Sequence, residues 1–312
     1  MLNGWIILDK PVGLGSTTAV SAVKRILREA GESKTKVGHG GTLDPLASGV
    51  LPIALGEATK LAGRMLDAAK AYEFTIRFGG ETDTLDAEGE VVAASDLRPT
   101  AEQVEAILPR FMGEIEQVPP AYSAVKIGGK AAYARARAGE DVDLKSRKVT
   151  IHSLLVCHPR ASGGPASLEE QRDSRFRGND EVTLSAVVSK GTYIRSLARD
   201  IAHALGSVGH VSYLRRTRAG PFSLESAISL DFLEEAAKAR ALTRTVLPLT
   251  AALDDIPALP VTPDQARLLR HGQRLSGFPA KPGLSLATPE GTPVALVEAL
   301  ADGLKVVRGF NL

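Results

Sequence analysis

The chain has 312 residues, 44% of them apolar, and its 38 basic and 36 acidic residues give a formal net charge of +2. Single hydrophobic cores stop growing near this length, so we expect two domains. The single cysteine, Cys157, excludes an internal disulfide and a thiolate metal cluster. No apolar run approaches the roughly 18 residues of a membrane span. We therefore expect a cytoplasmic protein without a membrane contact, and any nucleic-acid surface must come from local clustering of charge.

Hydrophobic spacing predicts two helices near the N-terminus and then a strand. Residues 16–30 and residues 57–69 both place apolar side chains at the helical period. Over residues 72–78 the period changes to two, which is typical of a strand with one buried face. Two local signals follow this strand. Thr100 and Gln103 form a capping-box pattern that predicts a helix after Thr100, and Gly128 with Gly129 predicts a hairpin turn.

Strand patterns at residues 149–156 and 182–188 flank a segment of different composition. Residues 159–180 hold only two large apolar side chains, and their four basic and four acidic residues cancel. Such a segment cannot bury a core of its own. We interpret it as a mobile insertion without an RNA-binding role.

The last third of the chain begins with a helix and ends in a second, smaller unit. Apolar residues from 194 to 205 predict a helix that starts beside Tyr193 and Arg195. A linker-like composition follows at residues 256–260, and then a short capped helix that starts at residue 262 and ends by Gly272. The tail reads as a hairpin of residues 294–298 and 304–310.

The run from His39 to Gly49 isolates one carboxylate, Asp44, in a mostly uncharged loop. Gly40 and Gly41 allow a tight turn and a close approach to a ligand. Pro45 fixes its own φ and keeps Asp44 out of the helical region. The loop therefore aims a single acid, although short glycine and proline clusters also occur in ordinary connections.

Four ordered motifs resemble the signatures of the bacterial tRNA pseudouridine-55 synthases, the TruB family. They are Val37 to Lys60, Lys70-Ala-Tyr72, Ser189-Lys-Gly-Thr-Tyr-Ile-Arg195 and His210-Val-Ser-Tyr-Leu-Arg-Arg216. The resemblance begins at Leu8-Asp-Lys-Pro-Val-Gly13, extends to about residue 250 and is weaker beyond. It implies a mixed α/β catalytic domain over residues 1–250, built on a central, mainly antiparallel sheet. It also implies a small, strand-rich PUA-like RNA-binding domain over residues 256–312.

The resemblance also implies roles for individual residues. Asp44 falls on the catalytic aspartate of the family, and Arg195 is our candidate for the cation that pairs with it, since guanidinium matches carboxylate geometrically. Tyr72 and Tyr193 match tyrosines that stack on or lie near the target base, and Leu214 matches a leucine of the pocket wall. The alternative role for these three is packing in the core, and that of Arg195 is a phosphate contact or a structural ion pair.

His39 matches a histidine that helps to flip the nucleotide out of its stack, which would offset part of the unstacking cost. Lys10, in the N-terminal motif, is expected to support the active-site loop. Between residues 190 and 218 six cations face one acid. This clustering predicts phosphate contacts by Lys190, Arg215 and Arg216, with a solvated surface as the alternative.

These features favour an enzyme that isomerises a uridine at position 55 of the tRNA T arm, with no cofactor and no metal. We expect tRNA as the partner, no small-molecule cofactor and a monomer. The alternative is a noncatalytic tRNA-binding or tRNA-folding protein, and Asp44 argues against it, because a pure binder gains nothing from an acid that faces a polyanion. A glycosidase would need two carboxylates, and no second acid has a comparable setting.

Overall fold

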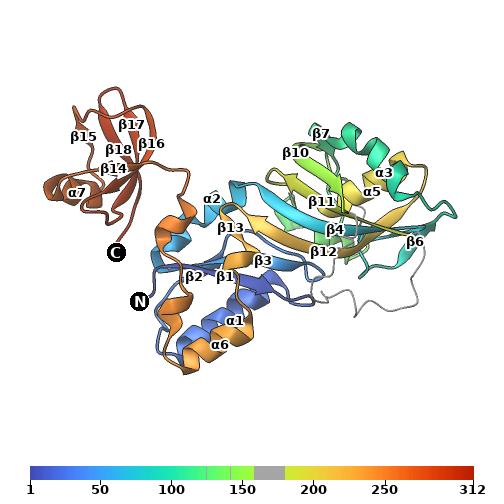
Figure 1. Ribbon diagram of the computed structural model, residues 1–312, viewed down its shortest axis with the longest axis horizontal. Coiled ribbons are helices and arrows are strands. Elements are labelled where there is room, and N and C mark those ends of the chain that lie inside the picture. Colours follow the sequence, from blue (N-terminus) through green and yellow to red (C-terminus); the bar gives the residue numbers. More distant parts are fainter. Residues whose placement is uncertain (124, 141, 158–179) are drawn as a thin grey trace.

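The computed structural model describes residues 1–123, 125–140, 142–157 and 180–312. A long twisted sheet runs through most of the molecule, and a smaller sheet lies at the C-terminal end (Figure 1). The segment predicted as an insertion, residues 159–180, lies outside the described residues except for Asp180. None of the described helices combines the length and the apolar character needed to cross a membrane.

Seven strands follow one another across the main sheet, and two short strands extend it. The order is β1 (Gly4–Lys10), β3 (Ser48–Leu55), β12 (Gly209–Ala219), β4 (Lys70–Phe78), β11 (Glu181–Val188), β10 (Arg147–Val156) and β7 (Gly113–Gln117), with β13 (Phe222–Ser223) paired to β12 and β2 (Val37–His39) paired to β3. Every pair is antiparallel except β12 with β3. This confirms the predicted mixed α/β fold with a mainly antiparallel central sheet.

Burial along the strands follows from what covers each face. In β11, buried residues alternate with partly exposed ones, as expected for a strand with one face on a core. In contrast, β3 is buried along its whole length. Its alternate side chains enter two different hydrophobic clusters, with Leu51 and Ile53 in one and Val50 and Ala54 in the other. Both faces of the sheet are therefore covered at β3, the strand that follows the Asp44 loop.

Four helices pack beside the main sheet. Helices α1 (Ser16–Glu29) and α6 (Leu230–Lys238) contact each other near β1, while α5 (Ile194–Ala204) and α3 (Ala101–Ile107) lie near β12 and β10 (Figure 1). The helices predicted at 16–30, after Thr100 and from 194 are thereby confirmed. The capping box of Thr100 and Gln103 forms as the sequence indicated.

Only the second half of the helix predicted over residues 57–69 is an α-helix. Residues Gly56–Leu61 form a 3₁₀ turn, η1, and α2 (Ala62–Asp67) follows. The Thr59 hydroxyl donates a hydrogen bond of 2.7 Å to the Gly56 carbonyl. Hydroxyl side chains of this kind compete with the regular helical hydrogen bonds, which accounts for the tighter first part.

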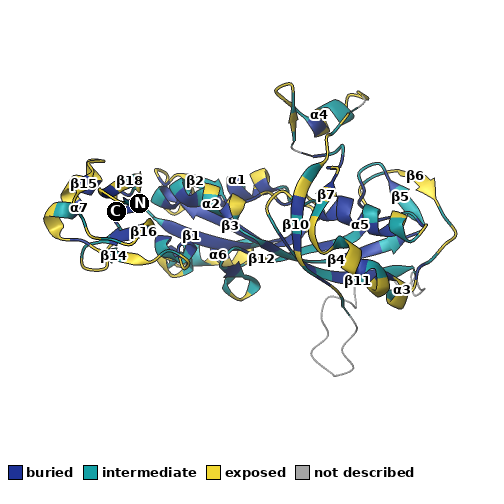
Figure 2. Cartoon of the chain, turned by 90° about the horizontal axis from the view of Figure 1, so that it is seen from above, coloured by how far each residue is buried: buried dark blue, intermediate teal, exposed yellow. Residues whose placement is uncertain are grey.

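A small arm projects from the main body of the molecule (Figure 2). It consists of β8 (Lys126–Ile127), β9 (Lys130–Ala131) and α4 (Ala132–Ala136). Gly128 and Gly129 lie between the two strands with φ of +56° and +86°. Two successive residues with positive φ form the hairpin turn that best matches strand twist. The predicted turn is therefore confirmed.

The remaining short elements connect these parts. They are β5 (Gly80–Thr82), β6 (Val91–Ala94), η2 (Leu108–Phe111), η5 (Leu224–Ser226), η6 (Leu242–Thr245) and η7 (Leu249–Ala252). Strands β5 and β6 pair with each other in a separate two-stranded sheet. The chain between them, residues 83–90, is the turn that supplies acidic side chains to the site described below.

The C-terminal end forms a five-stranded sheet with one helix. The strand order is β14 (Ala258–Pro260), β16 (Gly283–Thr288), β17 (Ala295–Leu300), β18 (Gly303–Gly309) and β15 (Leu275–Ser276), and the helix is α7 (Pro263–Arg270). Thr262 and Gln265 form a capping box at the start of α7. The predicted capped helix and terminal hairpin are confirmed, whereas the likeness to a PUA domain stays a prediction.

A buried junction joins the two sheets. Trp5 of β1 is 0% exposed, its ring centroid lies 5.4 Å from that of Phe222, and its indole N–H donates to the Leu249 carbonyl at 3.2 Å. The same hydrophobic cluster contains Leu286 of β16 and Phe310. The smaller sheet is therefore packed against the larger one through apolar side chains.

Candidate active site

The Asp44 loop, residues 40–47, connects β2 to β3 and is supported by a hydrogen bond from Lys10. The Lys10 side chain is 0% exposed. Its ammonium group donates to the carbonyls of Pro11 at 2.9 Å, Leu14 at 2.6 Å and Pro45 at 3.4 Å. Burial lowers the pKa of Lys10 to about 8, and the negative charge of Asp44 opposes this shift. The predicted supporting position of Lys10 is confirmed.

A second anchor fixes the residue before Asp44. The Ser16 hydroxyl donates to the Leu43 carbonyl at 2.8 Å, and the Leu43 N–H donates back to this hydroxyl at 2.7 Å. Ser16 is the first residue of α1, so the helix start is bonded directly to the loop. The backbone on both sides of Asp44 is thus held by buried polar contacts, which limits the positions that its carboxylate can take.

Arg216 lies beneath the same loop. It is 1% exposed, and its guanidinium donates to the carbonyls of Val50 at 2.7 Å and of Gly41 and Thr42 at 3.2 Å each. Arg216 also lines the cavity around Asp44. Its phosphate contact stays a prediction, and it would have to compete with the three carbonyls that the buried guanidinium already binds. Arg216 follows Leu214 by two residues on β12, and the period of two places both on the inner face.

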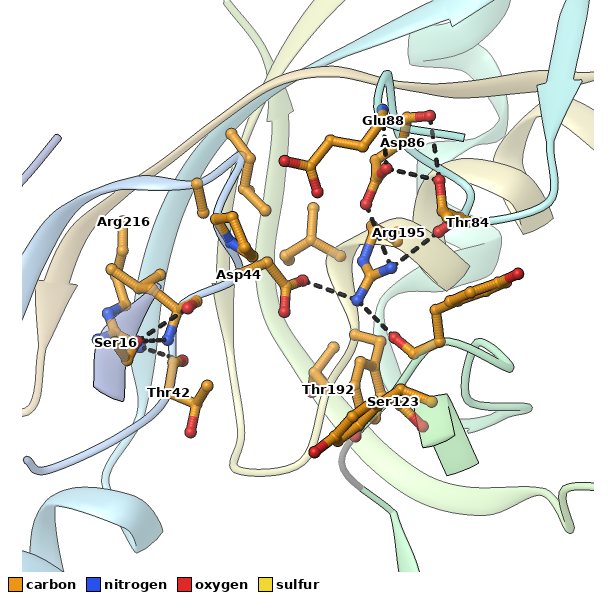
Figure 3. A pocket seen from close by; sticks show the side chains of 18 of the residues that line it. Ser16, Thr42, Asp44, Thr84, Asp86, Glu88, Ser123, Thr192, Arg195 and Arg216 are labelled. Carbon is orange, nitrogen blue, oxygen red and sulfur yellow. Dashed lines mark hydrogen bonds and ion pairs between the residues drawn. The ribbon is translucent and has the colours of Figure 1, made fainter. Parts of the chain in front are cut away.

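Asp44 and Arg195 contact each other in the lining of a cavity of about 850 Å³. The Arg195 Nη2 atom lies 2.8 Å from Asp44 Oδ2 (Figure 3). Arg195 is 5% exposed, whereas the Asp44 side chain is partly open to the cavity. Tyr193 precedes α5 and Arg195 is its second residue, so the helix start aims the guanidinium at the loop. The structure therefore brings together the acid and the cation that the sequence paired.

Arg195 also binds a second carboxylate that the sequence analysis missed. Its Nη1 atom lies 3.2 Å from Asp86 Oδ2. Asp86 is 2% exposed and accepts hydrogen bonds from the Thr84 hydroxyl at 2.6 Å and the Glu88 N–H at 3.1 Å. The expectation that no second acid has a comparable setting was wrong, because Arg195 lies between Asp44 and Asp86.

Backbone carbonyls complete the surroundings of this guanidinium. Arg195 donates to the Thr84 carbonyl at 2.8 Å and to the Tyr122 carbonyl at 3.0 Å. The Arg195 side chain therefore contacts three separate segments: the Asp44 loop, the turn after β5 and the segment that leads to the projecting arm. Glu88 also lines the cavity, and its pKa is raised by burial and by the charges of Asp86 and Asp44.

Three predicted substrate residues line this cavity. Tyr72 of β4 and Tyr193 are half-buried, and Leu214 of β12 is buried. The Arg147 guanidinium lies over the Tyr193 ring, 4.6 Å from its centroid. Aromatic and apolar side chains beside a polar cluster are the usual lining of a pocket for a flipped base. The structure thus gathers Asp44, Tyr72, Tyr193, Arg195 and Leu214 around one cavity.

His39 and Lys190 lie apart from this group. His39, at the end of β2, is half-buried, and its Nδ1 accepts a hydrogen bond of 3.3 Å from the Gly41 N–H. Burial and the charge of Arg216 lower the pKa of His39. Lys190 is exposed and its ammonium lies 2.9 Å from Asp67. His39 therefore borders the loop, two residues from Gly41, and Lys190 belongs to the outer surface.

The basic cluster predicted between residues 190 and 218 is largely neutralised. Besides the pair of Lys190 with Asp67, Arg215 lies 2.7 Å from Asp9 and Arg199 lies 2.8 Å from Asp200. Arg195 and Arg216 are buried. Phosphate contacts by Lys190 and Arg215 stay predictions, but each would have to replace an existing ion pair.

The signals for the missed residues were weak. Asp86 and Glu88 lie in a turn with several acids and glycine, a composition that usually marks a solvated loop. Tyr122 contributes a carbonyl, which no side-chain pattern reveals. Arg216 had a usable signal, since strand alternation places it on the face of Leu214. The described residues contain no group of three or more potential metal ligands.

The chain belongs to the TruB family of pseudouridylate synthases. Residues 24–194 match the family model described as the N-terminal domain of TruB family pseudouridylate synthases. Residues 195–254 match the C-terminal domain of tRNA pseudouridylate synthase B. Together these matches cover most of the chain, including Asp44 and Arg195.

Relatives and solved structures agree with this family. The chain is 58% identical to tRNA pseudouridine synthase B of Zymomonas mobilis, over 99% of this chain and 96% of the relative. It is 57% identical to the Novosphingobium aromaticivorans protein of the same name, over 100% and 98%. A structure of an H/ACA RNP bound to a substrate RNA containing 2′-deoxyuridine matches with a TM-score of 0.69 and 25% identity, over 99% of this chain and 85% of that chain. A Cbf5-Nop10-Gar1 complex matches with a TM-score of 0.68 and 27% identity, over 99% and 85%.

Proposed function

We propose that this enzyme converts the uridine at position 55 in the T arm of tRNA to pseudouridine, with Asp44 as the catalytic carboxylate. The main support is the pairing of Asp44 with Arg195 at 2.8 Å in a cavity lined by Tyr72, Tyr193 and Leu214. The names of the relatives from Zymomonas mobilis and Novosphingobium aromaticivorans support tRNA as the substrate.

The reaction breaks the bond from C1′ to N1 of uridine and forms a bond from C1′ to C5, while C5 loses a proton and N1 gains one. It transfers no external group and changes no oxidation state. Asp44 can attack the base or the sugar, or it can assist glycosidic cleavage and later proton removal, and each route uses one carboxylate. Arg195 stabilises the negative charge of Asp44 where the bound base excludes water, since ion pairing offsets the cost of desolvation.

The other cavity residues bind the flipped nucleotide. Tyr72 and Tyr193 offer aromatic rings on which a base can stack, and Leu214 forms an apolar wall. His39, beside Gly41 at the edge of the loop, fills the place that the flipped base leaves in its stack. The C-terminal sheet of residues 258–309 provides a further RNA contact, in keeping with its predicted PUA-like character.

The decisive experiment compares Asp44→Asn with the parent on a tRNA transcript. Asparagine keeps the shape of the side chain and removes its charge, so pseudouridine formation should fall to background while tRNA affinity stays within about tenfold. Asp231→Asn is a matched control, because Asp231 is exposed on α6 and does not line the cavity. Pseudouridine at position 55 is quantified by mapping the modified nucleotide.

Three results would count against the proposal, in whole or in part. Substantial turnover by Asp44→Asn would remove Asp44 from the chemistry. A parent protein that binds tRNA tightly yet forms no pseudouridine would favour the alternative, a noncatalytic tRNA-binding or tRNA-folding protein. Formation of pseudouridine at a different uridine would retain the enzyme class and change the substrate position.

A further inference from the structure

A second groove lies between α1, the segment that follows it and β2, outside the Asp44 cavity. In Figure 1, α1 runs beside α6 below the main sheet, and β2 lies at the N-terminal end of the same region. The groove is lined by Ser21, Lys24, Arg25, Leu27, Arg28, Glu32, Ser33, Lys34, Thr35, Lys36, Val37, Gly38 and Thr59. None of these residues borders the Asp44 cavity.

The lining carries five cations and one acid, although the whole chain has a net charge of only +2. Arg25 is paired with Glu29 and Glu234. The other four cations are exposed, and within the described part of the chain no ion pair or side-chain hydrogen bond is formed by Lys24, Arg28, Lys34 or Lys36. This local excess is what an electrostatic footprint for a polyanion requires.

The contrast with the cluster of residues 190–218 is informative. There, most cations are buried or paired with acids, as shown above for Arg195, Arg216, Lys190 and Arg215. A phosphate group gains little from a cation that already has a carboxylate partner. The unpaired cations of the α1–β2 groove are therefore the better candidates for contacts with an RNA backbone.

The backbone that carries these cations is held in place by α1 and by hydrogen bonds to the segment after it. Thr35 is buried between Lys34 and Lys36, so both lysines point away from the core. The Lys36 carbonyl accepts a hydrogen bond of 2.8 Å from the Gly56 N–H. Lys24 and Arg28 are four residues apart on α1, which places them on one face about 6 Å apart along the axis. The backbone then needs little ordering on binding, and the remaining cost is the rotamer entropy of the exposed lysine and arginine side chains.

The groove offers charge and few apolar anchors. Leu27 is buried in the core, and none of the described residues that line the groove is aromatic. Protein partners usually bind through buried aromatic or arginine anchors in apolar pockets. A chain of phosphates, in contrast, draws most of its binding energy from lysine and arginine and needs no apolar anchor. Lys36 is three residues from His39, so by strand geometry the groove begins about 10 Å from the edge of the Asp44 loop.

We propose that the α1–β2 groove binds the sugar–phosphate backbone of the tRNA outside the target nucleotide, through Lys24, Arg28, Lys34 and Lys36. The identity of the RNA as tRNA rests on the proposed function. The groove supplies affinity and orientation without reading sequence, because phosphate contacts carry no base information. The cavity around Asp44 holds the flipped uridine, and the groove holds a neighbouring stretch of the same molecule.

The test measures tRNA binding by the full-length protein at several salt concentrations. Lys34→Ala/Lys36→Ala should weaken tRNA binding about tenfold. It should also reduce the slope of log K against log salt by about 2, because the loss of two phosphate contacts lowers the number of counterions released on binding. Lys24→Ala/Arg28→Ala should behave alike from the other wall of the groove. The matched control is Lys238→Ala/Arg244→Ala, which removes the same charge from exposed positions outside the groove and should bind like the parent.

Turnover at saturating tRNA should be unchanged in both groove variants, because neither wall touches the reacting atoms. If both variants bound tRNA within twofold of the parent affinity and with an unchanged salt slope, the proposal would be overturned, and the groove would not be a tRNA-binding surface. A fall in saturated turnover without a change in affinity would overturn it too, since the lysines would then act through the Asp44 loop. The binding assay does not depend on catalysis. If the parent formed no pseudouridine, the proposed function would be refuted, and the binding results would still show whether the groove binds tRNA.

Discussion

Replacing Arg195 with methionine separates its role in the fold from its role in the chemistry. The change keeps most of the side-chain volume and removes the charge between Asp44 and Asp86. Asp86 is 2% exposed, so it would be left as a buried carboxylate without its cation. Breaking a buried pair in this way costs about 3–5 kcal/mol. Because Thr84 and Glu88 still donate hydrogen bonds to Asp86, we expect the lower end, about 3 kcal/mol.

The double variant Arg195→Met/Asp86→Asn supplies the control. Neutralising Asp86 removes the buried charge, so we expect about 2 kcal/mol of the lost stability to return. Activity should not return, because Asp44 still lacks its cation, and we expect kcat to stay at least about a hundredfold below the parent. Urea unfolding gives the stabilities, and pseudouridine formation under saturating tRNA gives kcat. Recovery of activity together with stability would show that Arg195 acts only by supporting the fold.

Two further predictions concern Lys10 and Tyr72. Activity should fall as the pH rises through about 8, because Lys10 then loses its proton and with it the charged hydrogen bonds to three carbonyls. The variant Lys10→Met should have a lower kcat than the parent, and its kcat should not decrease further across this pH range. The pKa of Lys10 is about 8 in the folded state, against an ordinary value of 10.5. Between these values the unfolded chain binds more protons, so the Lys10 contribution favours folding as the pH rises there. Unfolding measured at pH 7.5 and at pH 9.5 checks the sign, and a pH–rate profile of both proteins checks the activity. Tyr72→Leu should lower kcat/KM by a factor that corresponds to about 1–3 kcal/mol of lost stacking, with a smaller loss of stability; a variant as active as the parent would assign Tyr72 to the core.

Much of the secondary structure was predictable because its signals are local. The capping boxes at Thr100 and Thr262 need only a hydroxyl and a glutamine three residues later, and both form. The turn at Gly128 and Gly129 depends on two residues that tolerate positive φ. The 3₁₀ turn of residues 56–61 was missed, because a helical spacing of apolar residues does not distinguish two helices of similar pitch.

The site was predictable where one motif carries the chemistry and unpredictable where contacts join distant segments. Asp44 stands out because two glycines and a proline surround it. Asp86 lies 42 residues further along in an ordinary acidic turn, and only the fold places it against Arg195. The number of cations between residues 190 and 218 did not predict how many of them are exposed and unpaired. A sequence window cannot show that Arg216 is buried or that Arg215 is paired with Asp9.

The buried junction around Trp5 gives the protein a built-in optical probe. Trp5 is the chain's single tryptophan, and it lies where the large sheet meets the C-terminal sheet. Indole emission therefore reports on this one place. If the C-terminal sheet opens before the rest, as regions of lower local stability can, water reaches Trp5 and the emission shifts to the red while the Asp44 cavity is still folded. Fluorescence of the unlabelled protein can thus follow the contact between the two sheets during tRNA binding, without a dye and without a substitution.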